Sequence, residues 1–116
     1  MEVWNESKGV RLAWQAQVAE TFWTKLRGWT GKKTYPVGEA LVIRSCKGVH
    51  TFFMKEPVDM VILDREQRIV QMLHSVTPYK MVPLGGVATH VVEFPAGTLS
   101  ATGTQCHDTL AFGSMR

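Results

Sequence analysis

The chain has 116 residues, of which 45% are hydrophobic and 20% are charged, and its formal net charge is +3. This length suits one domain with its own core, and this composition excludes general intrinsic disorder. The apolar runs are far shorter than the roughly 18 residues of a membrane span, and the N-terminus lacks the basic start and apolar stretch of a signal peptide. We therefore expect a single domain over residues 1–116, located in the cytoplasm, with no membrane partner.

The first pattern along the chain is an alternation of residue types over residues 10–18. One face carries Val10, Leu12, Trp14, Ala16 and Val18, and the other carries Arg11, Ala13, Gln15 and Gln17. A period of two predicts a half-buried strand. The turn-forming residues 7–9 (Ser-Lys-Gly) come before it, so we expect Val3 and Trp4 to form the other arm of a hairpin.

A change of period at Ala19 predicts a short helix. The apolar residues Ala19, Phe22, Trp23 and Leu26 follow the spacing of one helix face. Thr21 suits the N-cap and Gly28 suits the C-terminal stop, so we expect one N-terminal helix around residues 21–28. Residues 30–38 show no periodicity and are predicted to form an exposed loop.

Basic and aromatic residues gather around this predicted helix. Residues 1–55 carry 9 basic and 4 acidic side chains, whereas residues 56–116 carry 4 and 6, so the positive charge belongs to the first half. Within the patch 23–33, four basic residues are interleaved with two tryptophans: Trp23, Lys25, Arg27, Trp29, Lys32 and Lys33. Phosphate contacts and base stacking suit nucleic acid. A solvated surface explains so few charges more simply, so nucleic-acid binding is kept only as an alternative.

Short strand-like runs fill the rest of the chain. They cover residues 40–45, 48–54, 58–64, 68–77, 88–94 and 109–112, with turn-forming residues between them. Together with one early helix, they predict a mainly β (α+β) fold in which a curled antiparallel sheet forms a small barrel-like or sandwich core. The run from Val58 to Leu63 is apolar on both faces, which predicts a central strand covered on both sides.

A stretch rich in metal-ligand residue types contains Cys46, His50 and Met54. Such residues together suggest a copper or zinc site. Residues four apart on a strand lie about 13 Å from each other, so a regular strand cannot bring these three to one ion. Convergence of His50 with His74 and His90 from neighbouring strands is left open. Histidines on half-apolar strands are usually hydrogen-bonded core or boundary residues, so we predict no metal and no cofactor.

Motifs of nucleotide binding and of nucleophilic catalysis are missing from the sequence. It has no Gly-rich phosphate-binding loop and no Gly-x-Ser-x-Gly. Cys46 and Cys106 have no C-x-x-C spacing, so we expect reduced thiols that fill small core spaces, and a disulfide between them is left open.

Two acidic residues interrupt apolar runs, Asp59 within residues 58–63 and Glu93 between Val92 and Phe94. An unpaired buried carboxylate costs several kcal/mol. Each residue therefore either accepts hydrogen bonds from backbone N–H groups or an arginine, or lines a pocket with a perturbed pKa. If both faced one pocket, they could divide acid and base roles, as in glycosidases.

Several segments together resemble a known protein family. They are Leu26-Arg27-Gly28-Trp29, the apolar run 40–43, the motif 50–54 (His-Thr-Phe-Phe-Met), the run 57–64 that begins Pro-Val-Asp, Val70, Pro78, the segment 91–97 (Val-Val-Glu-Phe-Pro-Ala-Gly), Gly103 and Asp108. Over about residues 10–112 the chain is similar to the bacterial and archaeal family called domain of unknown function 192. Helix ends in that family usually read Arg-x-x-Gly-Leu-Met, whereas Trp29 and Thr30 follow Gly28 here.

The resemblance implies a small fold dominated by a curled β-sheet, and it implies no established activity. The residues that match the family's polar motif positions are the candidate binding residues: Arg27, His50, Met54, Asp59 and Glu93. Our leading hypothesis is a non-enzymatic binding or accessory domain, with a partly polar pocket around the last four of these, for a small molecule or a protein. The alternatives are a hydrolase or lyase that uses Asp59 and Glu93 as an acid–base pair, and a weak nucleic-acid binder through the patch 23–33.

Overall fold

The structure is a computed structural model that describes residues 1–19, 37–44, 48–50, 57–77, 81–83, 86 and 89–113, with the backbone alone at residues 19, 44, 48–50 and 81–83. The helix expected around residues 21–28 and the basic patch 23–33 lie outside the described residues. No helix in the described ranges is both long enough and apolar enough to cross a membrane.

Strands dominate the described part of the chain. They are β1 (Val3–Asn5), β2 (Val10–Ala13), β3 (Gln15–Ala19), β4 (Glu39–Arg44), β5 (Gly48–His50), β6 (Val58–Leu63), β7 (Ile69–Val76), β8 (Met81–Pro83), β9 (His90–Pro95) and β10 (Leu110–Phe112), joined by the helix α2 (Thr98–Thr102). The prediction of a mainly β fold is confirmed.

The largest sheet has five strands in the order β3-β4-β9-β6-β7. Its pairs are antiparallel except for β3 and β4, which run parallel. All six residues of β6 are buried, and the strand lies between β9 and β7. The prediction that residues 58–63 form an interior strand covered on both sides is confirmed.

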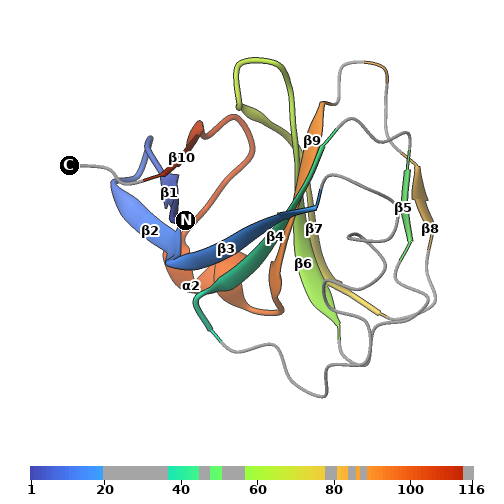
Figure 1. Cartoon of the computed structure of the whole chain (residues 1–116), viewed down its shortest axis with the longest axis horizontal. Coiled ribbons are helices and arrows are strands. Elements are labelled where there is room, and N and C mark those ends of the chain that lie inside the picture. The colour runs from blue at the N-terminus through green and yellow to red at the C-terminus, as the bar shows by residue number, and fades with distance from the viewer. Residues whose placement is uncertain are drawn as a thin grey trace.

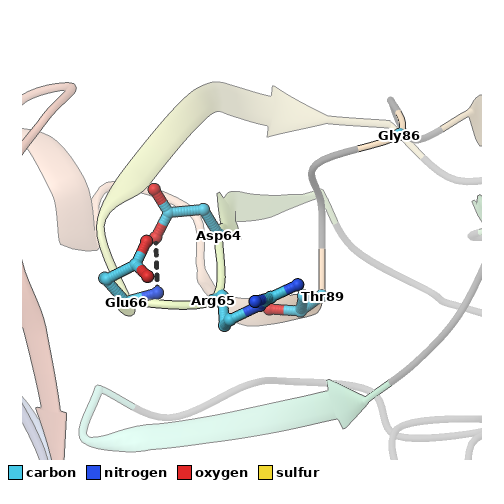
Figure 2. Close-up of a pocket in the computed structure, with 5 residues that line it drawn as sticks. All are labelled: Asp64, Arg65, Glu66, Gly86 and Thr89. Atoms are coloured by element: carbon cyan, nitrogen blue, oxygen red, sulfur yellow. Dashed lines mark hydrogen bonds between the residues drawn. The ribbon is translucent and has the colours of Figure 1, made fainter.

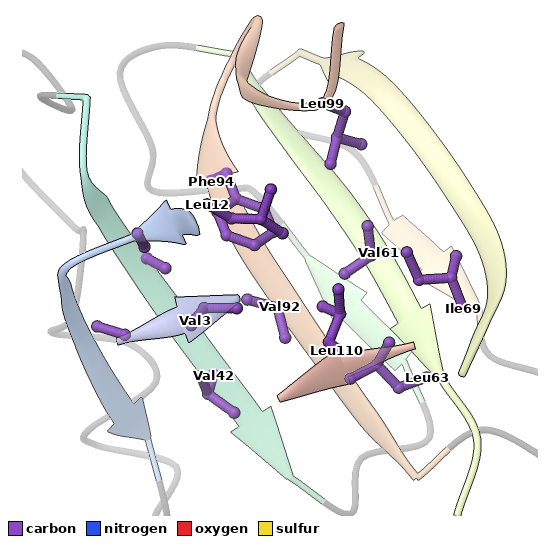
Figure 3. Close-up of a cluster of buried hydrophobic side chains, with 13 residues drawn as sticks. Val3, Leu12, Val42, Val61, Leu63, Ile69, Val92, Phe94, Leu99 and Leu110 are labelled. Atoms are coloured by element: carbon purple, nitrogen blue, oxygen red, sulfur yellow. The ribbon is translucent and has the colours of Figure 1, made fainter. Parts of the chain in front are cut away.

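Two smaller sheets lie on opposite sides of the five-stranded sheet (Figure 1). The sheet β10-β1-β2 and the helix α2 lie on one side, and the pair β5-β8 lies on the other. The core cluster fills the space on the first side (Figure 3) and consists of Val3, Leu12, Ala13, Ala16, Ala40, Val42, Val61, Leu63, Ile69, Val92, Phe94, Leu99 and Leu110. The described strands thus form three open sheets, two of which enclose the core cluster, and none of these sheets closes on itself.

The alternating segment 10–18 is two strands, so the prediction of one strand is wrong. The chain changes sheets at Trp14, where the carbonyl oxygen of Gly38 accepts hydrogen bonds from the N–H groups of Trp14 and Gln15, both at 2.9 Å. β2 pairs with β1, which confirms the hairpin, whereas β3 pairs with β4. The expected faces fail only at the break, where Ala13 is buried and Trp14 is 44% exposed, whereas Leu12 and Ala16 are buried as expected.

Two elements were missed by the sequence patterns, α2 and β8. The turn expected at Pro95-Ala96-Gly97 leads directly into α2, which has only five residues. Gly97 and Gly103 flank this helix with φ angles of 98° and 67°. Both angles lie in the left-handed region that favours glycine, so the two glycines define a helix too short to show a periodic pattern.

Candidate functional site

Asp59 is buried in β6 and is fully hydrogen-bonded. Its Oδ1 accepts a hydrogen bond from the N–H of Ser75 at 2.9 Å, and its Oδ2 accepts bonds from the N–H groups of Gly97 and Leu99, both at 3.0 Å. Gly97 and Leu99 begin α2, whose first N–H groups have no partner within the helix. Asp59 therefore caps α2 from a strand of the five-stranded sheet.

The hydrogen bond from Ser75 reaches Asp59 at an irregular point of the edge strand β7. Ser75 has a φ of 52°, which is uncommon for a residue with a side chain. The register between β6 and β7 shifts between Val58 and Met60, next to this contact. The Asp59 carboxylate thus links its own strand, β6, to β7 and α2 through backbone N–H groups. This is the structural role that the sequence analysis gave as one of two alternatives for Asp59.

Glu93 is buried in β9 and has no such partners among the described residues. Its side chain is 0% exposed, and neither carboxyl oxygen has a hydrogen-bond partner in the described part of the chain. In the register it lies between Leu41 of β4 and Met60 of β6, both fully buried. Burial removes water from the carboxylate and raises the pKa of Glu93 from 4.5 to about 8. The side chain therefore holds a proton at neutral pH.

The two buried carboxyl groups lie on opposite faces of the sheet. Asp59 is in register with Phe94, which belongs to the core cluster, whereas Glu93 is in register with Met60, which does not. Residues in register share a face and successive residues alternate between faces. The geometry therefore gives no support to an acid–base pair of Asp59 and Glu93 within one cleft.

The face of Glu93 is the one turned toward β5 and β8 (Figures 1 and 3). His50, a candidate from the sequence, ends β5, where its backbone pairs with Met81. Arg27 and Met54 lie outside the described residues. The structure thus places the strand of His50 on the same side as the Glu93 carboxyl.

The histidines and acidic residues form no metal site within the described ranges. His74 is exposed on β7 and His90 is half-buried on β9. No group of three or more His, Cys, Asp or Glu side chains among the described residues is arranged to hold a metal ion. Only the backbone of His50 is described, so convergence of its side chain with His74 and His90 stays an open prediction.

Cys106 carries a free and exposed thiol. It lies in the turn between α2 and β10, so it fills no core space, and that part of the expectation is wrong. Cys46 lies outside the described residues.

A polar network that the sequence did not indicate ties Asp108 to the first turn of the chain. Its Oδ2 accepts hydrogen bonds from the Asn5 side chain and the Gln105 N–H, both at 2.9 Å, and the Nζ of Lys8 lies 2.9 Å from Oδ1. Desolvation opposes ionisation here, but the bonds from Asn5, Gln105 and Lys8 outweigh it and hold the pKa of Asp108 below its ordinary value. In the sequence, only the resemblance to the family pointed to Asp108. Its partners Asn5 and Lys8 are distant along the chain, so no local pattern could indicate the network.

A polar surface pocket of about 430 Å³ lies at the β6–β7 turn (Figure 2). The described residues that line it are Asp64, Arg65, Glu66, Gly86 and Thr89. Asp64 Oδ1 accepts hydrogen bonds from the N–H groups of Glu66 and Arg68, both at 2.9 Å. This carboxylate therefore stabilises the turn.

Comparison with known proteins gives consistent relatives for most of the chain. The model of the family described as uncharacterized ACR, domain of unknown function 192, matches residues 3–112. A UPF0127 protein of Thermococcus sibiricus is 30% identical over 111 residues, which cover 90% of this chain and 70% of that protein. A UPF0127 protein of Pyrococcus abyssi is 27% identical over 99 residues, which cover 80% of this chain and 81% of that protein.

Two crystal structures share the fold. A protein of unknown function from Novosphingobium aromaticivorans matches with a TM-score of 0.80 at 16% identity, covering 96% of this chain and 82% of its own. A Sinorhizobium meliloti protein, whose name proposes transcription regulation, matches with a TM-score of 0.76 at 14% identity, covering 95% of this chain and 89% of its own. At such identities the likeness concerns the fold alone. The family match over residues 3–112 carries more, and it shows that this chain belongs to the domain of unknown function 192 family, a family of unknown function.

Proposed function

We propose that the protein is a non-enzymatic binding or accessory domain that recognises its ligand through Glu93. The observation that carries the proposal is a carboxyl group that is fully buried and has no hydrogen-bond partner among the described residues. Leaving such a group without a partner costs about 1–3 kcal/mol, and more when it is charged. A ligand that supplies the missing hydrogen bonds gains that free energy on binding.

The other candidate residues take supporting places in this proposal. His50 belongs to β5, which lies on the side of the sheet that Glu93 faces (Figure 1), and this supports a place for it in the pocket. Arg27 and Met54 are added as binding candidates by the resemblance to the family. Asp59 does not contact the ligand, because it lies on the opposite face, where it ties β6 to β7 and to the start of α2.

The proposal includes the arrangement and location of the protein. The whole chain forms one domain, its sheets curl around the core as a small sandwich or barrel-like body, and it works in the cytoplasm. The packing of β10-β1-β2 over one face of the five-stranded sheet supports the sandwich arrangement.

The proposal is tested with a thermal-shift panel of small compounds on the wild type, Glu93→Gln and Glu66→Gln. Glu66 is an exposed acidic residue, so Glu66→Gln makes the same chemical substitution at the surface and serves as the matched control. The panel holds alkylamines, alkylguanidines, carboxamides and alcohols of two to six carbons. We expect one class to raise the Tm of the wild type and of Glu66→Gln but not that of Glu93→Gln. A panel in which no compound separates wild type from Glu93→Gln contradicts the proposal.

A second candidate is nucleic-acid binding through the patch 23–33, since the name of the Sinorhizobium meliloti structure proposes transcription regulation. Contacts between lysine or arginine and phosphates release counterions, so affinity for a labelled DNA duplex falls steeply with salt. We expect an anisotropy titration at 50 and 200 mM salt to show this loss if the patch binds DNA. Affinity that does not change with salt removes the candidate.

A further inference from the structure

The surroundings of Glu93 contain no described positive charge. The described residues on its face of β4, β6 and β9 include Leu41, Ile43, Met60, Ile62 and Val91, all at most 4% exposed. The Glu93 carboxyl can accept hydrogen bonds on both oxygens, and no described residue donates one.

The titratable residues of the neighbouring strands place no positive charge beside Glu93 among the described side chains. Asp59 and His90 are in register with Phe94 and Leu63 of the core cluster, so they belong to the other face. Glu39 begins β4 on the face of Leu41, but it is acidic and only half-buried. The facing pair β5-β8 carries one titratable residue, His50, and β7 carries the exposed His74. The described side chains on this face therefore provide no counter-charge for Glu93.

We infer, building on the proposed function, that the ligand of Glu93 is a small organic cation: an ammonium, amidinium or guanidinium group on a short apolar body. Its N–H groups donate hydrogen bonds to both carboxyl oxygens, and its apolar body packs against the flanking Leu41 and Met60 side chains. The cation approaches from the side of β5 and β8, because the core cluster fills the opposite side (Figure 3).

The chemistry of the carboxyl group favours a cation over a neutral acceptor. A protonated carboxyl has one O–H to donate, so a neutral carbonyl ligand would use only part of its capacity. An ionised carboxylate accepts on both oxygens, and hydrogen bonds between two charged partners are shorter and roughly twice as strong as neutral ones. A cation therefore satisfies both oxygens at once.

Binding of the cation displaces the proton of Glu93. The pKa of Glu93 is about 8, so at lower pH the free protein holds this carboxyl as COOH. The cation R–NH3⁺ pairs with COO⁻, so one H⁺ leaves to the buffer for each cation bound, and charge and atoms balance. Affinity therefore rises about tenfold per pH unit below that pKa and levels off above it.

The experiment is isothermal titration calorimetry with butylammonium and butylguanidinium, beside their neutral counterparts 1-pentanol and pentanamide. Titrations at pH 6.0, 7.0 and 8.5, in two buffers with different heats of ionisation, measure both affinity and proton release. We expect the two cations to bind the wild type and Glu66→Gln, with about one proton released at pH 6.0. Glu93→Gln, which keeps the shape of the side chain, loses this binding and this proton release.

The possible outcomes separate this inference from the proposed function. If the neutral compounds bind, and bind more weakly at pH 8.5 than at pH 6.0, Glu93 donates its proton to an acceptor; the cation inference is then wrong while the binding proposal stands. If the cations bind the wild type and Glu93→Gln equally well, or release no proton, the inference is also wrong. If none of the four compounds separates wild type from Glu93→Gln, both proposals fail.

Discussion

Asp59 of β6 and Glu93 of β9 lie one register position apart in neighbouring strands, yet their carboxyl groups point to opposite faces of the same sheet. The face of Asp59 meets the beginning of α2, which supplies two backbone N–H groups, and the third comes from Ser75. The register neighbours of Glu93 in β4 and β6, Leu41 and Met60, are apolar, and neither of its carboxyl oxygens has a hydrogen-bond partner among the described residues. One carboxyl group therefore stabilises the fold, and the other is left with unused hydrogen-bonding capacity.

Removal of the Asp59 carboxylate is expected to destabilise the protein strongly. Asp59→Ala leaves three backbone N–H groups without an acceptor, two of them at the start of α2, where Leu99 is fully buried. We expect a loss of about 3–5 kcal/mol in the free energy of unfolding, measured by urea denaturation followed by circular dichroism. Hydrogen exchange at the Leu99 amide should accelerate more than exchange in β9.

Asp64→Ala is the matched control for that substitution. Asp64 also accepts hydrogen bonds from backbone N–H groups, but in an exposed turn where water replaces the lost acceptor. We expect a loss of about 1 kcal/mol. Equal losses for Asp59→Ala and Asp64→Ala would show that the capping of α2 by Asp59 contributes nothing beyond an ordinary turn.

Glu93→Gln is expected to stabilise the protein above neutral pH. The pKa of Glu93 is about 8 in the folded state and near 4.5 in the unfolded chain. Between these values the folded state binds one proton more, so wild-type stability falls as pH rises, by up to about 1.4 kcal/mol per pH unit. The amide of the Glu93→Gln variant does not titrate, so the stability difference should be small at pH 4.5 and should grow until about pH 8.

Thermal melts of wild type, Glu93→Gln and Glu66→Gln from pH 4.5 to pH 9 measure this difference. The exposed control Glu66→Gln should follow the wild-type curve. A Glu93→Gln curve parallel to that of the wild type over the whole range would show that Glu93 ionises freely in the folded protein.

Asp108→Asn is expected to show the opposite dependence on pH. The hydrogen bonds from Asn5 and Gln105 and the Lys8 ion pair keep the pKa of Asp108 below its ordinary value of 3.8. Its stabilising contribution is therefore complete above pH 3.8 and is lost as pH falls through the lower, folded-state pKa. The wild type should exceed Asp108→Asn in stability at pH 6, and the two should converge in acid.

Lys8→Met separates the ion pair from the rest of that network. The Lys8 side chain is 35% exposed, so water screens its attraction to Asp108. We expect a loss of no more than about 1 kcal/mol in a urea titration at pH 6. A loss as large as that of Asp108→Asn would assign the network to charge attraction rather than to hydrogen bonds.

Gly38→Ala is expected to damage the point at which the chain changes sheets. A Cβ at Gly38 would collide with the ring of Trp14, and the φ of 99° is unfavourable for a residue with a side chain. We expect a loss of about 3 kcal/mol in the free energy of unfolding. The control Gly9→Ala has a φ of 68° but no atom within 4 Å of the new Cβ, so it should lose only about 1–2 kcal/mol. Equal losses would mean that the Trp14 ring moves aside without cost.

The strands were predictable where the sequence pattern is local. The run 58–63 is apolar on both faces because β6 has neighbours on both sides and layers above and below it. The change of sheet at Trp14 was not predictable, because the alternation continues through it and its cause is the carbonyl group of Gly38, which is distant in sequence. The alternation of apolar and polar residues indicates which face of a strand is buried, but it does not indicate which other strand it pairs with.

The candidate site was predictable in part for the same reason. A charge inside an apolar run marks a residue that needs an explanation, and both Asp59 and Glu93 are fully buried. Which of them is satisfied depends on Ser75, Gly97 and Leu99, which come together with Asp59 only in the folded chain. The binding roles of Arg27, His50 and Met54 remain predictions.

The pairing of β1 with β10 has a consequence for the folding process. These strands join the two ends of the described chain, and the Asn5–Asp108 hydrogen bond spans a sequence separation of 103 residues. Contacts this distant are slow to form, since a long loop must close before they contribute to stability. During synthesis β1 leaves the ribosome well before its partner β10, and it stays without this partner until β10 has been made. We therefore expect the layer that covers the core cluster to close last, which leaves the apolar face of the five-stranded sheet exposed in folding intermediates.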